Sequence, residues 1–258
     1  VDNRSYVAGD KSAPLRHQTI PEMLRETVSK FGSREAITFP LQDISLTYEE
    51  LARRVDALAA GLLALGLKKG DRIGIWSPNN LQWILTQYAT ARIGLILVNI
   101  NPAYRLSELE YALNKSGCRA SLEIVIGLTD DPGPGIYPFS KIETLGGEAE
   151  RARLDEITES LTPDDPINIQ FTSGTTGAPK GATLTHFNIV NNAAHTVGRM
   201  NFTEEDRLCI PVPLYHCFGM VMGSLGCVSK GAAMVFPGEA FDPEETLLAT
   251  SRARCTAL

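Results

Sequence analysis

The sequence predicts an α/β protein with a doubly wound, mostly parallel sheet and helices on both faces. Six short apolar runs, rich in β-branched residues, have the length and composition of buried parallel strands. Helical patterns separate these runs, and this alternation is typical of doubly wound folds. The expected strands are 36–39, 72–76, 95–100, 167–171, 208–212 and 232–236.

Three of the expected helices begin with a capping box, in which a hydroxyl residue stands three positions before a glutamate. The pairs are Thr19 with Glu22, Thr47 with Glu50, and Ser107 with Glu110. After Thr47, apolar residues recur at helical spacing up to Gly66, which supplies a stop. Further helical patterns cover roughly 80–92, 107–116, 185–200, 217–229 and 243–252.

Two clusters of turn-forming residues divide the chain. Residues 130–135 are all aspartate, proline or glycine, and 162–166 contain two prolines and two aspartates. We therefore expect a loop over 128–147, within a linker that covers 128–165. This places one α/β subdomain at 1–127 and a second at 166–258.

The composition excludes some classes of protein. A net charge of −6 over 258 residues, without a Lys/Arg run, argues against a nucleic-acid partner. The five cysteines lack C-x-x-C spacing and read as reduced intracellular thiols, and the four histidines show no metal-ligand spacing. The uncharged stretch 208–229 contains Pro211 and Pro213, so it fits a membrane-spanning helix poorly. The residues after Val1 do not resemble a signal peptide.

The most informative residues form the run FTSGTTGAPKG, from Phe171 to Gly181. An expected strand leads into a turn of hydroxyl and glycine residues, followed by Lys180 and a helix capped near Thr185. Glycines let backbone N–H groups approach phosphate oxygens, hydroxyls add donors, and lysine adds a positive charge, so the parts suit a mobile triphosphate. The run does not fit the Walker A spacing, because Gly174 is followed five residues later by Pro179. The alternative to a triphosphate-binding loop is a polar surface loop without a ligand.

This run resembles the phosphate-loop signature of the adenylate-forming superfamily, which includes acyl-CoA synthetases, aryl-CoA ligases and peptide-synthetase adenylation domains. Segments 46–51, 70–76 and 99–104 look like the family's N-terminal landmarks. Segments 165–170 and 188–192 resemble the acyl-CoA synthetase family member 2 group of medium-chain fatty acid ligases.

The resemblance implies a chemistry and a set of substrates. A carboxylic acid, here a fatty acid, reacts with ATP to give acyl-AMP and pyrophosphate, and coenzyme A then displaces AMP to form the thioester. Mg²⁺ accompanies the ATP, and its protein ligands stay unassigned. The implied nucleotide-binding residues are Thr172, Ser173, Gly174, Thr175, Thr176, Gly177, Ala178, Pro179 and Lys180.

A second segment, PLYHCFG at 213–219, resembles the part of the family that lines the acyl pocket. The resemblance makes Lys180 and His216 the candidate catalytic residues, and His216, Gly219 and Met220 the candidate substrate pocket. A neutral imidazole of His216 could donate a hydrogen bond there. Without the resemblance, a satisfied core histidine at a strand end is the ordinary alternative. We expect His186 near a helix start, as a structural residue.

The sequence departs from the family pattern in two places. Between 118–120 and 124–126 the family has a longer connection, so we expect an uncovered sheet edge or apolar face. The family also continues beyond Leu258 with a second half that carries the adenine-binding segment and the hinge. We therefore expect this chain alone to be inactive.

Three hypotheses remain open. The first is the N-terminal portion of an ATP-dependent fatty acyl-CoA synthetase. The second is another adenylate-forming ligase, either an aryl-CoA ligase or a peptide-synthetase domain. The third is a non-catalytic ATP-binding half-module. We expect an intracellular location, cytoplasmic in a bacterium and in the mitochondrial matrix in a eukaryote, and the sequence sets no oligomeric state.

Overall fold

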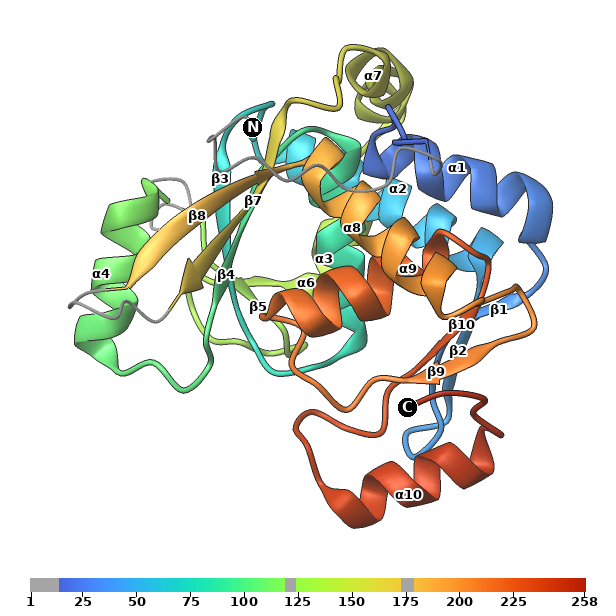
Figure 1. Ribbon diagram of the computed structural model, residues 1–258. Helices are drawn as coiled ribbons and strands as arrows, with labels where there is room; N and C mark the ends of the chain where they lie inside the picture. The colour runs from blue at the N-terminus through green and yellow to red at the C-terminus, as the bar shows by residue number, and fades with distance from the viewer. Residues whose placement is uncertain (1–13, 119–123, 173–178) are drawn as a thin grey trace, which may run out of the picture.

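The computed structural model describes residues 14–118, 124–172 and 179–258. Two four-stranded sheets, in the order β2-β1-β10-β9 and β3-β4-β7-β8, flank a central group of helices (Figure 1). We call them the first and the second sheet. The α/β class with mostly parallel strands is confirmed, although the strands are divided between two sheets.

The first sheet joins strands from both ends of the chain. It contains β1 (Glu35–Phe39), β2 (Ile44–Thr47), β9 (Arg207–Cys209) and β10 (Ala233–Val235). Strand β10 runs parallel to both β1 and β9, whereas β2 is antiparallel to β1. Phe39 and Phe236 stack with ring centroids 5.0 Å apart, which fixes the two segments side by side.

The second sheet carries the segments around the expected phosphate loop. It contains β3 (Arg72–Trp76), β4 (Ile96–Ile100), β7 (Pro166–Thr172) and β8 (Lys180–Thr185). The first three are parallel, and β8 folds back antiparallel on β7. Among the described strands, β3 is therefore at one edge and β8 at the other. A short ladder joins β5 (Ile126–Gly127) to β6 (Tyr137–Pro138).

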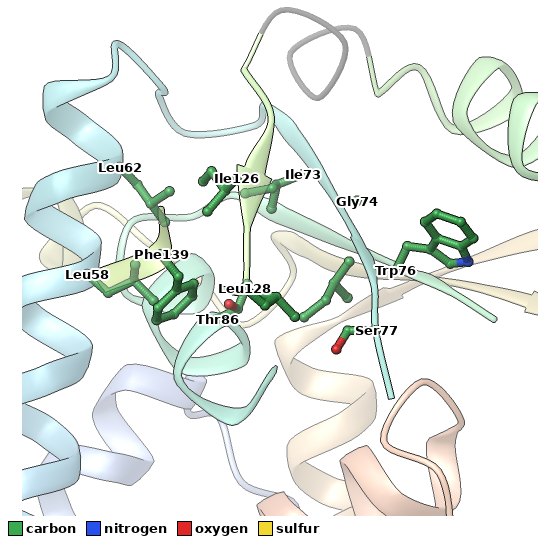
Figure 2. A pocket seen from close by; sticks show the side chains of 11 residues that line it. Leu58, Leu62, Ile73, Gly74, Trp76, Ser77, Thr86, Ile126, Leu128 and Phe139 are labelled. Carbon is green, nitrogen blue, oxygen red and sulfur yellow. The ribbon is translucent and has the colours of Figure 1, made fainter. Parts of the chain in front are cut away.

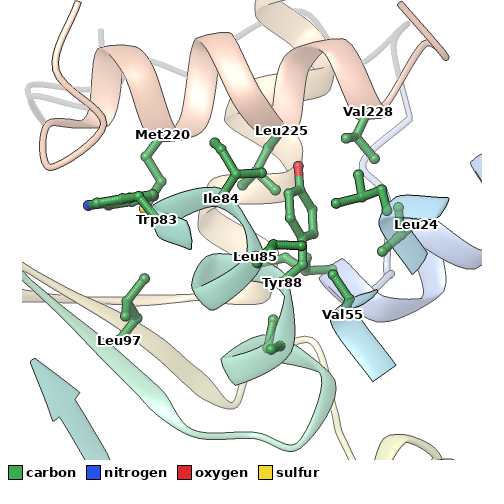
Figure 3. Close-up of a cluster of buried hydrophobic side chains, with 14 of the residues drawn as sticks. Leu24, Val55, Trp83, Ile84, Leu85, Tyr88, Leu97, Met220, Leu225 and Val228 are labelled. Carbon is green, nitrogen blue, oxygen red and sulfur yellow. The ribbon is translucent and has the colours of Figure 1, made fainter. Parts of the chain in front are cut away.

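Most helices pack between the two sheets and form one large core (Figure 1). In Figure 3, side chains from several helices and from β4 meet in this layer. The hydroxyl groups of Tyr88 and Ser224 form a hydrogen bond of 2.9 Å, so the buried Tyr88 hydroxyl has a partner. The helices are α1 (Ile20–Phe31), α2 (Tyr48–Ala64), α3 (Leu81–Arg92), α4 (Leu106–Ser116), α6 (Phe139–Leu145), α7 (Glu148–Glu159), α8 (His186–Arg199), the π-helix η1 (Phe218–Leu225), α9 (Gly226–Val228) and α10 (Pro243–Arg252).

The outer face of the second sheet has a smaller core of its own. Ile96, Val98 and Ile100 alternate on β4 and pack with Ile169, against residues of α4. The intervening residues of β4 point to the inner face, because side chains alternate along a strand. Helices thus cover both faces of this sheet, as the sequence pattern predicts.

Two expected capping boxes are confirmed and one is wrong. Thr19 and Thr47 each cap a helix and pair with Glu22 and Glu50. Helix α4, however, begins at Leu106, and the carboxylate of Glu108 accepts from the backbone N–H of Arg105 at 2.9 Å. The helix starts two residues earlier than Ser107 would allow, so Ser107 lies inside its first turn.

The expected loop at 128–147 is wrong in part, because it contains α6, and α7 follows within the expected linker. Helix α6 buries Phe139 and Ile142 against α2. Gly61 allows this close approach, since a Cβ there would lie 1.8 Å from the carbonyl oxygen of Ile142. Helix α7 buries little besides Leu154 and Thr158, so its apolar periodicity is too weak to recognise.

The sheets do not follow the expected boundaries at residues 127 and 166. Each sheet combines strands from before and after the expected linker: β1 with β10 in the first, and β4 with β7 in the second. The shortened join at 119–123 lies outside the described residues. Strand β3 lies at the edge of the second sheet, and its last residue, Trp76, is 51% exposed.

Candidate functional site

The antiparallel pairing of β7 and β8 brings the two flanks of the expected phosphate loop together. Thr172 and Lys180 are Cα partners at the end of this ladder, and the Thr172 hydroxyl donates to the Lys180 carbonyl oxygen at 3.4 Å. Both residues are exposed. Ser173, Gly174, Thr175, Thr176, Gly177 and Ala178 lie outside the described residues. Any ligand of that loop would therefore meet the ends of β7 and β8.

Pro179 is held from outside the hairpin. Its carbonyl oxygen accepts from the Tyr111 hydroxyl at 3.0 Å, and Tyr111 belongs to α4. Helix α4 also contacts β4 and β8. The residue before Lys180 is thus anchored to a helix, and this restricts the position of the Lys180 backbone.

The ends of β3, β4 and β7 lie at the same edge of the second sheet, because parallel strands point the same way. In open α/β sheets, ligands bind outside this carboxyl edge. The Trp76 indole N–H donates to the carbonyl oxygen of Asn101 at 3.1 Å, which ties the ends of β3 and β4 together. The phosphate-loop flanks stand at the same edge.

His216 lies in a tight turn that leads into the π-helix η1. Its backbone N–H donates to the Pro213 carbonyl oxygen at 3.2 Å, and its side chain is exposed. The ring Nδ1 accepts the backbone N–H of Phe218 at 3.2 Å. Since Nδ1 is an acceptor here, a neutral ring carries its proton on Nε2. His216 therefore offers an Nε2–H donor at the surface, which excludes the alternative of a buried core histidine.

The other two candidate pocket residues are buried in the core. A Cβ at Gly219 would lie 2.5 Å from the Pro213 carbonyl oxygen, so glycine is required for the turn to close. Met220 is 1% exposed, and its sulfur accepts from the Asn99 amide at 3.4 Å. The structure gives Gly219 and Met220 packing roles, and their contact with a substrate stays a prediction.

His186, expected near a helix start, is the first residue of α8. It is fully buried, and its Nδ1 accepts the backbone N–H of Ile20 at 3.1 Å. Burial lowers its pKa from 6.5 to about 4. A neutral histidine that ties α8 to α1 is structural, as expected.

An apolar cavity adjoins the His216 turn. Its volume is about 180 Å³, and Phe218, Met222 and Gly223 of η1 line one side. Other lining residues include Val197 of α8 and Leu208 of β9, together with Met200 and Ile210, which directly follow these two elements. The cavity has almost no polar lining, so it suits an aliphatic group.

A second apolar hollow lies beside β3, the edge strand two positions from β7 in the second sheet. It is about 80 Å³ in volume, and Figure 2 shows Ile73, Ile126, Leu128 and Phe139 around it. Ile126 and Leu128 follow the join at 119–123 in sequence, and Ile73 and Phe139 line the same hollow. The expectation that the shortened connection leaves an apolar face uncovered stays a prediction.

Three polar residues near the site have no counterpart among the sequence-based candidates. Asn99, Asn168 and Gln170 are buried amides on β4 and β7. Each interrupts an apolar strand run, and a buried amide is costly without partners. That interruption is the signal by which the sequence could have identified them.

The described residues contain no group of three or more His, Cys, Asp or Glu side chains that could hold a metal ion. Thr172 is exposed, and its hydroxyl oxygen is of the type that coordinates Mg²⁺. Among the helices that the structure describes, none is long and apolar enough to cross a membrane.

The chain is similar in sequence and in fold to known proteins. The chain is 40% identical to the medium-chain acyl-CoA ligase ACSF2, mitochondrial, of Danio rerio, over 98% of this chain and 48% of that protein. The human protein of the same name is 38% identical, over 100% of this chain and 49% of its own length. The apo structure of Mycobacterium smegmatis MbtA superposes with a TM-score of 0.81 at 25% identity, over 94% of this chain and 48% of that one.

Two further facts follow from these matches. The chain spans about half the length of the curated relatives that it matches. The human alignment extends over 302 positions against 258 residues here, so about 44 positions of the relative face gaps in this chain. Relative to the human protein, the aligned part of this chain is therefore shorter. Residues 24–258 match the family described as AMP-binding enzyme, and this chain belongs to that family of adenylate-forming enzymes.

Proposed function

We propose that this chain is the N-terminal portion of an ATP-dependent fatty acyl-CoA synthetase. In this proposal the enzyme activates a carboxylic acid as acyl-AMP and then transfers the acyl group to coenzyme A. The observation that carries the proposal is the pairing of Thr172 with Lys180 at the carboxyl edge of the second sheet. The names of the curated relatives, medium-chain acyl-CoA ligases, support the substrate class.

The described residues have distinct tasks in this proposal. The end of β7 and the start of β8 flank the loop that binds the β- and γ-phosphates, and the Lys180 ammonium attracts the departing pyrophosphate. The His216 Nε2–H donates to the substrate carboxylate and holds it near the α-phosphate. Positioning of this kind contributes several kcal/mol to a reaction between two bound groups. Mg²⁺, when bound with ATP, neutralises phosphate charge, and Thr172 is our candidate protein oxygen beside it.

The apolar cavity beside η1 supports an aliphatic acid. Phe218 stands two residues after His216 and lines this cavity. A carboxylate held by His216 could therefore extend its hydrocarbon chain along η1. We also propose an intracellular location, and the relatives' names favour mitochondria for a eukaryotic source.

Acid-dependent exchange of labelled pyrophosphate into ATP tests the proposal in the whole protein. We expect exchange with octanoate, and much slower exchange with benzoate or with amino acids. Faster exchange with benzoate or an amino acid would assign the chain to another adenylate-forming ligase. Binding of ATP without exchange for any acid would favour a non-catalytic ATP-binding module and refute the ligase proposal.

A further inference from the structure

The inner face of the second sheet carries a line of buried amides between the two parts of the site. Asn99 on β4 is 3% exposed, and Asn168 and Gln170 on β7 are 2% and 5% exposed. Leu97 pairs with Asn168, and Asn99 with Gln170, so all these side chains share one face. Their burial requires hydrogen-bond partners.

Asn99 contacts both sides of the candidate site with one side chain. Its Oδ1 accepts from Asn168 Nδ2 at 2.9 Å, on the strand that ends in the phosphate loop. Its Nδ2 donates to the carbonyl oxygen of Tyr215 at 3.2 Å, the residue before His216. The same Nδ2 lies 3.4 Å from the Met220 sulfur.

The direction of these hydrogen bonds is fixed at both ends by backbone carbonyls. The Tyr215 carbonyl can only accept, so the NH₂ group of Asn99 must face it. The Oδ1 of Asn99 then faces Asn168, which must present its own NH₂ group. That NH₂ group also donates to the Leu97 carbonyl oxygen at 2.8 Å. Each amide is therefore locked in one orientation.

The segment from Pro213 to Met220 is bonded to itself and held from two directions. The Met220 backbone N–H donates to the His216 carbonyl oxygen at 3.1 Å. Gln87 of α3 donates through Nε2 to the Met220 carbonyl oxygen at 3.3 Å. Asn99 holds the His216 side of the segment, and Gln87 holds the η1 side. Met220 and α3 face each other in this layer (Figure 3).

We propose that Asn99 is a positioning residue, which holds the His216 turn at a set distance from the phosphate-loop strand. The inference rests on the proposed function, since it concerns the placement of a carboxylate next to ATP. Asn99 touches neither substrate; it acts through the Tyr215 carbonyl on one side and through Asn168 on the other. A misplacement of about 1 Å between reacting groups can lower a rate on the order of 10²-fold.

A purely structural role is the competing explanation, because buried amide pairs also fix strand register and stability. The two roles differ in what a variant changes. A structural role alone lowers stability and leaves the rate of the folded enzyme unaltered. A positioning role lowers kcat in enzyme that is fully folded, while KM for ATP stays unchanged, because the β7–β8 hairpin is intact.

Asn99→Leu tests the proposal, with Thr90→Val as the matched control. Thr90 is equally buried, but its hydroxyl donates to carbonyl oxygens of its own helix, Thr86 at 2.8 Å and Gln87 at 3.1 Å. In the whole protein, below its melting temperature, we expect Asn99→Leu to lower kcat for acid-dependent pyrophosphate exchange on the order of 10²-fold. KM for ATP should change less than about twofold. Thr90→Val should keep wild-type kcat, and equal losses in both variants would overturn the proposal.

Asn99→Asp adds a pH signature. A carboxylate can accept from Asn168 but cannot donate to the Tyr215 carbonyl, whereas the protonated acid can do both. Burial opposite a carbonyl oxygen raises the pKa of the introduced acid. The ratio of variant to wild-type kcat should therefore rise as the pH falls through that pKa. A ratio independent of pH would contradict the assigned bond direction.

Hydrogen exchange of this chain separates failure of the inference from failure of the proposed function. Asn99→Leu should speed amide exchange in a peptide covering 216–222 on the order of tenfold or more, with Thr90→Val unchanged. Unchanged exchange would refute the positioning role even if the protein is an active ligase. If Asn99→Leu speeds amide exchange but the wild-type protein shows no pyrophosphate exchange, the proposed function is refuted. The catalytic purpose assigned to Asn99 is then refuted with it.

Discussion

Lys180→Ala, made in the whole protein, is the sharpest test of the phosphate-loop assignment. The contacts that the structure gives Lys180 come from its backbone, through the ladder with Thr172 and the bond from the Thr172 hydroxyl. The side chain is exposed at the first position of β8. Surface substitutions of this kind usually change stability by less than about 0.5 kcal/mol. We therefore expect an unchanged melting temperature.

The expected loss of activity follows from the interaction that is removed. A hydrogen bond between an ammonium and a phosphate oxygen contributes about 1.5–3 kcal/mol. Since about 1.4 kcal/mol corresponds to a tenfold change in rate, kcat/KM for ATP should fall about 10- to 150-fold. The fall appears in kcat if the contact strengthens as pyrophosphate leaves, and in KM if it is equally strong in the ground state.

The assay measures the two half-reactions separately. Adenylation is followed by pyrophosphate release, and thioester formation by the reaction of synthetic acyl-AMP with coenzyme A. The second reaction involves no triphosphate, so Lys180→Ala should leave it unaltered. Lys141→Ala removes another exposed lysine, on α6, and serves as the control. A thioester step that falls as much as adenylation would show that Lys180 supports the fold or the acyl pocket.

Three further predictions concern stability and the uncovered face. Between pH 6.5 and about 4 the unfolded chain protonates His186 and the folded chain does not, so acid should lower the free energy of unfolding by about 3 kcal/mol. His186→Gln should remove that part of the pH dependence in urea titrations; an unchanged slope would contradict it. Thr47→Ala should cost about 1 kcal/mol through a lost cap, whereas Ser107→Ala should cost less than about 0.5 kcal/mol. A family-length insertion between residues 120 and 121 should reduce ANS binding, and unchanged dye binding would mean that the hollow beside β3 is already closed.

The elements that were recognisable from sequence are those with strong local chemistry. Thr47 and Glu50 make the side-chain contacts of a capping box, which depend only on neighbours in sequence. Strand β4 buries all five of its residues, so its apolar run is unambiguous. Strand β8 was missed because its first four residues are exposed and its stability comes from pairing with β7. Helix α7 was missed for a similar reason, since tertiary contacts hold it.

One of those contacts shows what sequence patterns cannot supply. The Arg92 guanidinium lies 2.8 Å from both Asp56 and Asp155, and it also donates to the Leu154 carbonyl oxygen at 2.8 Å. It thereby joins α3 to α2 and α7. The hydrogen bond from Arg92 stabilises the Asp155 carboxylate and so lowers the pKa of Asp155. Partners 36 and 63 residues apart cannot be found from local periodicity.

The division of the chain into subdomains illustrates the same limit at a larger scale. The Pro/Gly-rich segment around 130–135 does separate strand groups in sequence, but β1 and β10 are parallel neighbours across it. A parallel pair needs a long crossover, and nothing in the composition says how long. The sequence therefore indicates the type of fold and leaves open which strands meet.

The candidate site differs from the rest of the fold, because there the exceptions to the apolar pattern carry the information. A buried parallel strand normally consists of apolar residues, yet β4 and β7 contain Asn99, Asn168 and Gln170. Departures from a local rule cost stability and are expected where function requires them. All three lie on the face toward η1, and two of them reach the Met220 sulfur. Buried polar residues that share one face of two paired strands, as on β4 and β7, thus identify the segment that these strands position. They do so before any ligand is known.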